Sequence, residues 1–371
     1  MSDLSIHVIL RGGLGNQLFQ YACAKAVSTI LSIDKIFFVD TAYQPRDPIG
    51  RENYLKKLLG SQYLSSDLNI EKPIKVQEQN FFEILNLISL DRSLYSCVML
   101  DGYFQSADYF LGIGPIIKSH IFSLLINLCE PRRDENITLH VRRSDYANFG
   151  LCSIEYYLSV VGSILDCSHE VQRIRIFSDE PLVANAYADV IINYLSIGRD
   201  QIFHDYETDP IVVLYKMSES SHLVIANSSL SWWAAYIADD TKTTIFCPTA
   251  PWILGSSANP AEPHWFCVNG AVRDNFSLDV SEELVLDYRR QITLQNFNAE
   301  YNKLCINCGS LPRVRIRFPE SESYVKLCEV CIVTAYSALE YAESYSPHGV
   351  SLAALVPTIT KRLRRNSSLP R

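Results

Sequence analysis

The start of the chain alternates between strand-like and helix-like patterns in a way that leaves few folds open. Residues 6–10, IHVIL, form a short β-branched run, and a turn then breaks it at Gly12, Gly13 and Gly15. Apolar residues recur at helical spacing through residues 18–30, and residues 35–40, KIFFVD, form a second apolar run. A strand, a helix and a second strand in this order predict a parallel sheet covered by helices, so we expect an α/β protein.

The same alternation continues along the chain. Further strands are expected at residues 97–104, 137–143, 173–179, 222–229 and 243–248, with helical patterns between them. At residues 130–136, EPRRDEN, an apolar helical pattern changes to a charged connection that contains proline. We therefore expect four segments: an α/β domain at 1–130, a second α/β domain at 131–275, a helix with a cysteine-containing segment at 276–345, and a basic tail at 346–371.

Composition and charge argue against some classes of function. The chain has 371 residues and a formal net charge of −8, which argues against a nucleic-acid-binding protein. We see no apolar run of membrane-spanning length, no signal peptide and therefore no transmembrane segment. Eleven cysteines, an odd number, favour reduced thiols and a cytoplasmic protein. The basic residues 361–371 fit either a soluble end or a peripheral contact with the inner, anionic face of a membrane.

Polar residues follow three of the predicted strands, and ligands of open α/β sheets bind at the carboxyl ends of the strands. In LHVRRSDY (139–146), alternation places His140 and Arg142 on one face and Arg143 on the other. An arginine at a strand end can clamp a diphosphate through two parallel hydrogen bonds. Asp145 fits either an orienting or a proton-accepting role. The other interpretation of this stretch is a structural arginine–aspartate pair.

Two more strand ends carry candidate ligand-binding groups. Asn227, Ser228 and Ser229 precede a helix, where they fit either an anion site or ordinary helix capping. Ser178, Asp179 and Glu180 follow another strand, where they fit either nucleotide binding or a solvated turn.

The glycine turn near the start has two interpretations. A nucleotide-dependent dehydrogenase would show G-x-G-x-x-G and an acid after the second strand. Gly13, Gly15 and Asp40 fit that pattern, but Leu18 stands at the third glycine position. In the other interpretation, the turn lets the backbone approach a sugar or diphosphate, and Asn16 and Gln17 supply amide groups.

Five motifs then occur together. GGLGNQLFQYA, GYFQS, HVRRSDY, FSDEP and ANSSLSWWAAY resemble, in order and spacing, the α-1,2-fucosyltransferases of glycosyltransferase family 11. The resemblance covers residues 6–270. It implies a GT-B-like fold, in which two Rossmann-like domains face a cleft, with residues 1–130 on the acceptor side and 131–275 binding GDP-fucose. It also implies inversion at fucose and transfer to the 2-hydroxyl of a galactose-type glycan.

The resemblance also implies roles for residues. Its arginine motif falls on His140, Arg142, Arg143 and Asp145, with Arg142 on the donor diphosphate. It places Ser178–Glu180 and Asn227–Ser229 near the nucleotide, and the turn of Gly12–Gln17 at the cleft from the other domain. The loop after Asp145 is shorter than in many relatives, so the acceptor stays open.

The charge that develops on departing GDP must be stabilised in the transition state. Many glycosyltransferases use a metal ion held by D-x-D, and this chain contains no D-x-D. An arginine and helix-terminal amides can stabilise the charge instead, so we predict catalysis without a catalytic metal. Asp145 is the candidate base for the acceptor hydroxyl, and bracing Arg143 is its other interpretation.

Four cysteines near the end have zinc-site spacing. Cys305, Cys308, Cys328 and Cys331 form C-x₂-C-x₁₉-C-x₂-C, and the sequence between the pairs predicts a hairpin. We expect a structural zinc, with incidental cysteines as the other interpretation.

Two other functions stay open: an NAD-dependent oxidoreductase, and a non-catalytic glycan- or nucleotide-binding protein. The acceptor is equally open between a lipid-linked oligosaccharide, a free glycan and another sugar.

Overall fold

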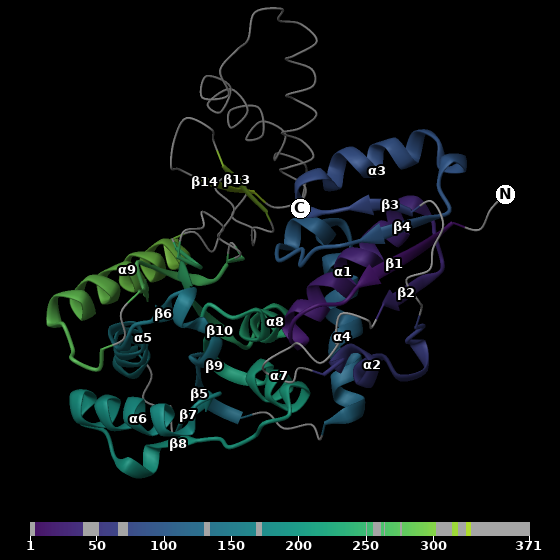
Figure 1. Ribbon diagram of the computed structural model, residues 1–371. Helices are drawn as coiled ribbons and strands as arrows, with labels where there is room; N and C mark the ends of the chain where they lie inside the picture. The colour runs from purple at the N-terminus through teal and green to yellow at the C-terminus, as the bar shows by residue number, and fades with distance from the viewer. Residues whose placement is uncertain are drawn as a thin grey trace, which may run out of the picture. The chain divides into compact units, whose positions relative to one another are not determined.

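The computed structural model describes residues 4–39, 52–65, 73–129, 134–167, 173–249, 251–254, 261–262, 264–274, 277–301, 314–317 and 324–327. The chain forms two compact units, Met1–Gln291 and Ile292–Arg371. The first contains two parallel sheets, each packed against helices (Figure 1). This confirms the predicted α/β architecture.

The smaller sheet has the strand order β2-β1-β4-β3, and every pair is parallel. Its strands are β1 (Ser5–Ile9), β2 (Ile36–Val39), β3 (Pro73–Val76) and β4 (Cys97–Leu100). The helices of this half are α1 (Leu14–Leu31), α2 (Tyr54–Leu59), α3 (Phe81–Leu90) and α4 (Gly114–Leu128).

The larger sheet has the order β11-β10-β9-β5-β7-β8, again with parallel pairs. Its strands are β5 (Asp134–Val141), β7 (Arg173–Ser178), β8 (Ile202–His204), β9 (Ser220–Val224), β10 (Thr244–Thr249) and β11 (Phe266–Asn269). From β5 the chain first builds outward through β7 and β8, and then returns to add β9, β10 and β11 on the other side. This is the Rossmann order, and its ligand-binding switch point lies between β5 and β9.

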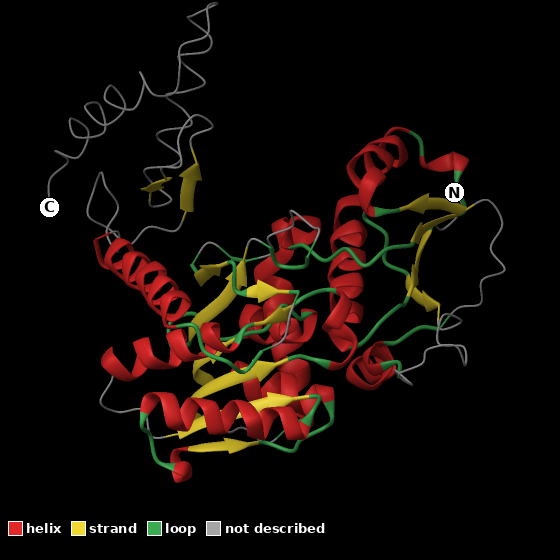
Figure 2. Cartoon of the chain, turned by 60° about the vertical axis from the view of Figure 1, so that its left-hand side comes forward, coloured by secondary structure: helices red, strands yellow, loops and turns green. Residues whose placement is uncertain are grey.

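Helices cover both faces of the larger sheet (Figure 2). They are α5 (Ile154–Cys167), α6 (Pro181–Leu195), α7 (Pro210–Ser218) and α8 (Ser229–Ile237). Helices α6 and α7 both begin with proline, whose fixed φ suits the first helical position. At the start of α7, the Asp209 carboxylate accepts a hydrogen bond from the Ile211 amide. The cap and the proline together define where this helix begins.

Within Met1–Gln291, an aromatic cluster joins the half that contains the smaller sheet to the half that contains the larger sheet. Helix α1 packs against α8, and the rings of Phe19 and Trp232 lie 4.6 Å apart at this contact. Phe110, which precedes α4, stacks on Trp233 at 5.6 Å. Both tryptophans are fully buried, and one continuous core contains residues of both sheets. The halves are therefore joined by apolar packing as well as by the chain.

Two short antiparallel strand pairs and a further helix are also formed. Strands β6 (Leu151–Cys152) and β12 (Val272–Arg273) form a short antiparallel pair, and α9 spans Glu282–Tyr301. In the second unit, β13 (Val314–Arg317) and β14 (Tyr324–Leu327) pair antiparallel, which confirms the predicted hairpin. The four cysteines with zinc-site spacing lie outside the described residues, as does the basic tail.

One segment corrects the expectation that no apolar run reaches membrane length. Residues Ala107–Leu128 are long and apolar enough to cross a membrane, by length and composition alone. In the structure this segment is a 3-10 turn, Ala107–Ile113, followed by α4, and Phe110 interrupts it with non-helical backbone angles. Helix α4 contacts α7 and α8, so it is part of the folded body.

Candidate active site

A cavity of about 470 Å³ opens where the carboxyl ends of β5, β7 and β8 meet the amino ends of α1 and α8. It lies at the switch point that the strand order defines. Many of the residues expected from sequence line it together: Gly13, Gly15, Asn16, His140, Arg142, Asp145, Ser178, Asp179, Ser228 and Ser229. Gln17, Arg143, Glu180 and Asn227 do not line it.

Arg142 is held between two carboxylates at the end of β5. Its Nη2 lies 2.5 Å from Oδ1 of Asp145, and its Nη1 lies 3.1 Å from Oδ2 of Asp179. The guanidinium also lies over the Tyr146 ring, 5.3 Å from its centre. Because both carboxylates approach from the protein, the guanidinium is fixed in position and remains partly exposed toward the cavity.

Asp179 organises the turn behind Arg142. Its Oδ1 accepts a hydrogen bond from the backbone amide of Arg143 at 3.0 Å, and its Oδ2 accepts one from the Ser144 hydroxyl at 2.5 Å. The Arg143 side chain turns away from the cavity toward Glu180, 3.9 Å from its carboxylate. The alternating faces predicted for Arg142 and Arg143 are thus observed. Asp145 pairs with Arg142, and its bracing of Arg143 stays a prediction.

His140 is the buried titratable group of the cavity wall. Its side chain is 5% exposed, and its Nδ1 has no hydrogen-bond partner among the described residues. Burial, and next the positive charge of Arg142, lower the pKa of His140 to about 4. The imidazole is therefore neutral near pH 7, and it can offer a hydrogen bond without carrying charge.

The amino end of α8 forms another wall. Its N-cap, Ser228, makes no side-chain capping hydrogen bond, and Ser228 and Ser229 line the cavity. Asn227 instead donates a hydrogen bond from its amide to the carbonyl of Gly150 at 2.9 Å and is fully buried. Ser228 and Ser229 thus border the cavity, and Asn227 fixes the turn.

The glycine turn reaches the cavity from the smaller sheet. Gly13 caps α1 without a side chain, and Gly12 has a φ of +73°, which favours glycine. Asn16 lines the cavity and accepts a hydrogen bond from the Gln105 amide at 2.6 Å. Gln17 is fully buried and bonds only to backbone, including the Leu55 amide at 2.9 Å. Its amide joins α1 to α2, and we do not carry it forward as a ligand-binding residue.

Sequence patterns did not predict the part of the cavity wall that the loop after β8 forms. The residues that line the cavity without having been expected are Leu14, Tyr54, Tyr146, Phe177, Pro181, His204, Tyr206, Glu207, Thr208, Pro210, Val213 and Leu230. Strand β8 has three residues, too few to show a strand pattern. The signal that was available is Pro210, because a proline that opens a helix marks the end of a loop at the strand edge.

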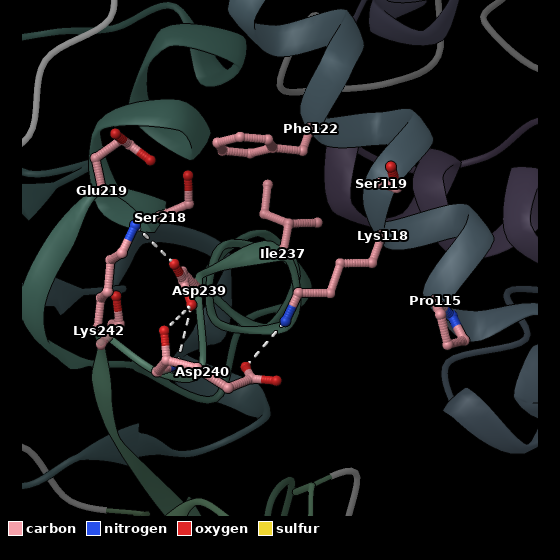
Figure 3. A pocket seen from close by; sticks show the side chains of 12 residues that line it. Pro115, Lys118, Ser119, Phe122, Ser218, Glu219, Ile237, Asp239, Asp240 and Lys242 are labelled. Atoms are coloured by element: carbon pink, nitrogen blue, oxygen red, sulfur yellow. Dashed lines mark hydrogen bonds and ion pairs between the residues drawn. The ribbon is translucent and has the colours of Figure 1, made fainter.

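A second cavity, of about 560 Å³, lies between α4 and the turn that follows α8 (Figure 3). Its charged side chains pair with each other: Lys118 with Asp240 at 2.9 Å, and Lys242 with Asp239 at 3.0 Å. It contains none of the residues expected from sequence, and it lies at the start of β10, away from the carboxyl ends of the strands. The first cavity is therefore the candidate active site.

A fixed guanidinium, a neutral imidazole and the amino ends of two helices all border that cavity. Backbone amides at helix amino ends and an arginine are groups that bind phosphate. Together with the Rossmann order of the larger sheet, they are features that nucleotide-binding α/β proteins share.

Comparison with known sequences shows similarity to one family of glycosyltransferases. The sequence model of glycosyl transferase family 11 matches residues 79–257. An alpha-1,2-colitosyltransferase of Escherichia coli is 26% identical, and the match covers 68% of this chain and 94% of that protein. The O-antigen biosynthesis glycosyltransferase WbnK of Escherichia coli is 25% identical, covering 67% of this chain and 95% of that protein. The chain is therefore similar to glycosyl transferase family 11 over residues 79–257.

Solved structures give looser matches. POFUT1 in complex with GDP-fucose aligns with a TM-score of 0.39 at 9% identity, covering 64% of this chain and 95% of that one. The heptosyltransferase WaaC of E. coli with ADP aligns with a TM-score of 0.44 at 9% identity, and the match covers 80% of this chain and 99% of that one.

Proposed function

We propose that this chain transfers L-fucose from GDP-fucose to the 2-hydroxyl of a galactose-type sugar in a glycan, with inversion at the fucose anomeric carbon. Similarity to glycosyl transferase family 11 supports glycosyl transfer. The α-1,2 linkage in the name of one relative and the O-antigen in the name of the other support an oligosaccharide acceptor, either lipid-linked or free. The sequence motifs support GDP-fucose as the donor.

One observation carries the proposal: Arg142 and the amino end of α8 border the same cavity at the switch point. When the bond between fucose and phosphate breaks, negative charge builds up on the GDP oxygens. A guanidinium held by Asp145 and Asp179 is positioned for that charge before the reaction starts. Donors fixed in this way stabilise a transition state more than water does, because they need not reorganise.

The acceptor hydroxyl must lose its proton as the new bond forms. Asp145 is the carboxylate that lines the cavity beside Arg142, and we keep it as the candidate base. Its Oδ1 lies 2.5 Å from Nη2 of Arg142, so the candidate base is held beside the charged group. An oxocarbenium-like path needs only a weak base, which a paired carboxylate can provide.

The experiment offers purified protein GDP-fucose, a colitosyl donor and NAD(H), with a panel of galactosides, and records GDP release and product linkage. Fucose joined α-1,2 to galactose is the expected product. Transfer of colitose without fucose would overturn the proposed donor. NAD(H) raising the melting temperature without GDP doing so would favour the oxidoreductase. GDP binding without transfer would favour a non-catalytic protein.

Arg142→Ala is the variant that tests the site. We expect the rate of transfer to fall by about 10²-fold or more, because one preorganised charge donor is lost. Arg199→Ala is the matched control, since Arg199 also pairs with an aspartate, Asp189, but on the exposed surface. Near-normal turnover by folded Arg142→Ala protein would contradict the assignment.

A structural zinc on Cys305, Cys308, Cys328 and Cys331, and a cytoplasmic location with peripheral contact to the inner membrane face, remain parts of the proposal. The zinc is supported by the cysteine spacing, and the membrane contact by the basic residues at 361–371.

A further inference from the structure

Gly15 lies where the two halves of the chain come closest at the cavity. It is the second residue of α1, and a Cβ placed on it would lie 2.5 Å from the amide nitrogen of Leu230 and 2.7 Å from the carbonyl oxygen of Ser229. Real Cβ atoms essentially never approach other atoms within 3.0 Å. The sequence indicated a glycine turn that a sugar or diphosphate approaches, but at Gly15 the group that approaches is the first turn of α8.

This contact sets the direction of both helices at the cavity. Helix α1 begins at Leu14 and α8 at Ser229, and residues from both first turns line the same cavity. Neither N-cap makes a side-chain capping hydrogen bond. The amides of the first turn of a helix have no partner within the helix, so two sets of amide donors border one cavity.

An independent feature of the same cavity also indicates a polar ligand. His140 lines the cavity, it is 5% exposed, and its Nδ1 has no hydrogen-bond partner among the described residues. A buried polar atom without a partner costs free energy unless a ligand or water completes it. Arg142 adds a fixed positive charge beside it.

We propose that Gly15 is a positioning residue: its missing side chain lets the amino ends of α1 and α8 close on one diphosphate-binding site. The inference rests on the proposed donor, GDP-fucose, and assigns Gly15 a role through α8 and not through contact with the sugar. A methyl group at residue 15 would push α1 and α8 apart at the cavity. Elsewhere in α1 the aromatic cluster around Phe19 would still hold the two helices together.

The test compares Gly15→Ala with wild type for binding of GDP and of guanosine, by calorimetry, with thermal unfolding as the measure of folding. We expect GDP to bind about tenfold more weakly or worse, because charge-assisted hydrogen bonds are lost, while guanosine binds as before. A purely structural defect would reduce the fraction of active protein and leave both affinities unchanged. Gly112→Ala is the matched control, since a Cβ there meets nothing within 4 Å.

A second variant approaches the site from α8 and introduces no clash at Gly15. Ser229→Pro removes one amide donor, and proline suits this position because Ser229 is the first helical residue and Ser228 is extended, with φ −124° and ψ 134°. It should also weaken GDP binding more than guanosine binding. This variant decides the question if Gly15→Ala protein does not fold.

Unchanged GDP affinity in folded Gly15→Ala protein, or in Ser229→Pro protein, would overturn the inference. So would an equal loss of GDP and guanosine binding. Failure of the wild-type protein to bind GDP at all would instead overturn the proposed donor, and the inference with it.

Discussion

His140 and Arg142 lie two residues apart at the carboxyl end of β5, and the structure gives them opposite electrostatic surroundings. Arg142 has two carboxylates as partners, so its charge is compensated by the protein. His140 has none in direct contact, and burial together with the charge of Arg142 disfavours its protonated form. The strand thus presents one permanent cation and one neutral imidazole to the same cavity.

The lowered pKa of His140 predicts how stability depends on pH. An unfolded histidine takes up its proton near pH 6.5, whereas folded His140 does so only near pH 4. Stability is therefore fully present above pH 6.5, and falls as the pH drops toward 4, by about 1.4 kcal/mol per pH unit from this residue. Urea unfolding of the wild-type protein and of His140→Asn between pH 6.5 and pH 4 measures this fall in stability. We expect a shallower decline in the variant, and identical slopes would contradict the account.

Sequence patterns predicted many of the residues that line the cavity, but not what each one contacts. Alternation along β5 correctly placed His140 and Arg142 on the cavity face. Nothing in the pattern distinguishes an amide that faces a ligand from one that holds two helices, so the buried bonds of Gln17 could not be foreseen. Gly15 is a similar case, because its neighbour is more than two hundred residues away in sequence.

Sequence patterns predicted the short strands least well. The long apolar strands β1, β5 and β7 were expected close to their observed bounds, because buried parallel strands read as continuous apolar runs. Strand β8 has three residues, and β3 lies in a region expected to be helices and loops. The cavity wall that follows β8 was missed for this reason.

The packing of α1 on α8 predicts a large loss of stability when it is opened. Phe19 is 2% exposed and contacts both Trp232 and Trp233. We expect Phe19→Ala to lower the free energy of unfolding by about 3–5 kcal/mol, the range for removing a buried aromatic side chain. Denaturant unfolding, followed by tryptophan fluorescence, measures this loss. Phe82→Ala, at a side chain 64% exposed, is the control and should change little.

A loss well below this range for Phe19→Ala would show that the two helices repack without the ring. The same experiment reports cooperativity. Because both sheets contribute to one core, fluorescence and circular dichroism should give coincident transitions for residues Met1–Gln291.

At the scale of the whole molecule, the apolar contact between the halves bears on catalysis. Domains that meet through small polar interfaces move relative to each other by default. Here the aromatic cluster includes Phe19 of α1 and Trp232 of α8, both close in sequence to the starts of these helices. Under the proposed function, Arg142 and the first turns of both helices would be held in place before GDP-fucose binds, which is the condition for electrostatic catalysis without reorganisation.

The central claim is that Arg142 and the helix amino ends stabilise departing GDP without a divalent cation. The most direct test is the rate of fucosyl transfer before and after treatment with EDTA, with unfolding recorded alongside so that loss of the predicted structural zinc is recognised. The account predicts an unchanged rate in folded, EDTA-treated protein and no increase when Mn²⁺ is added. A rate that disappears with EDTA and returns with Mn²⁺ would contradict it.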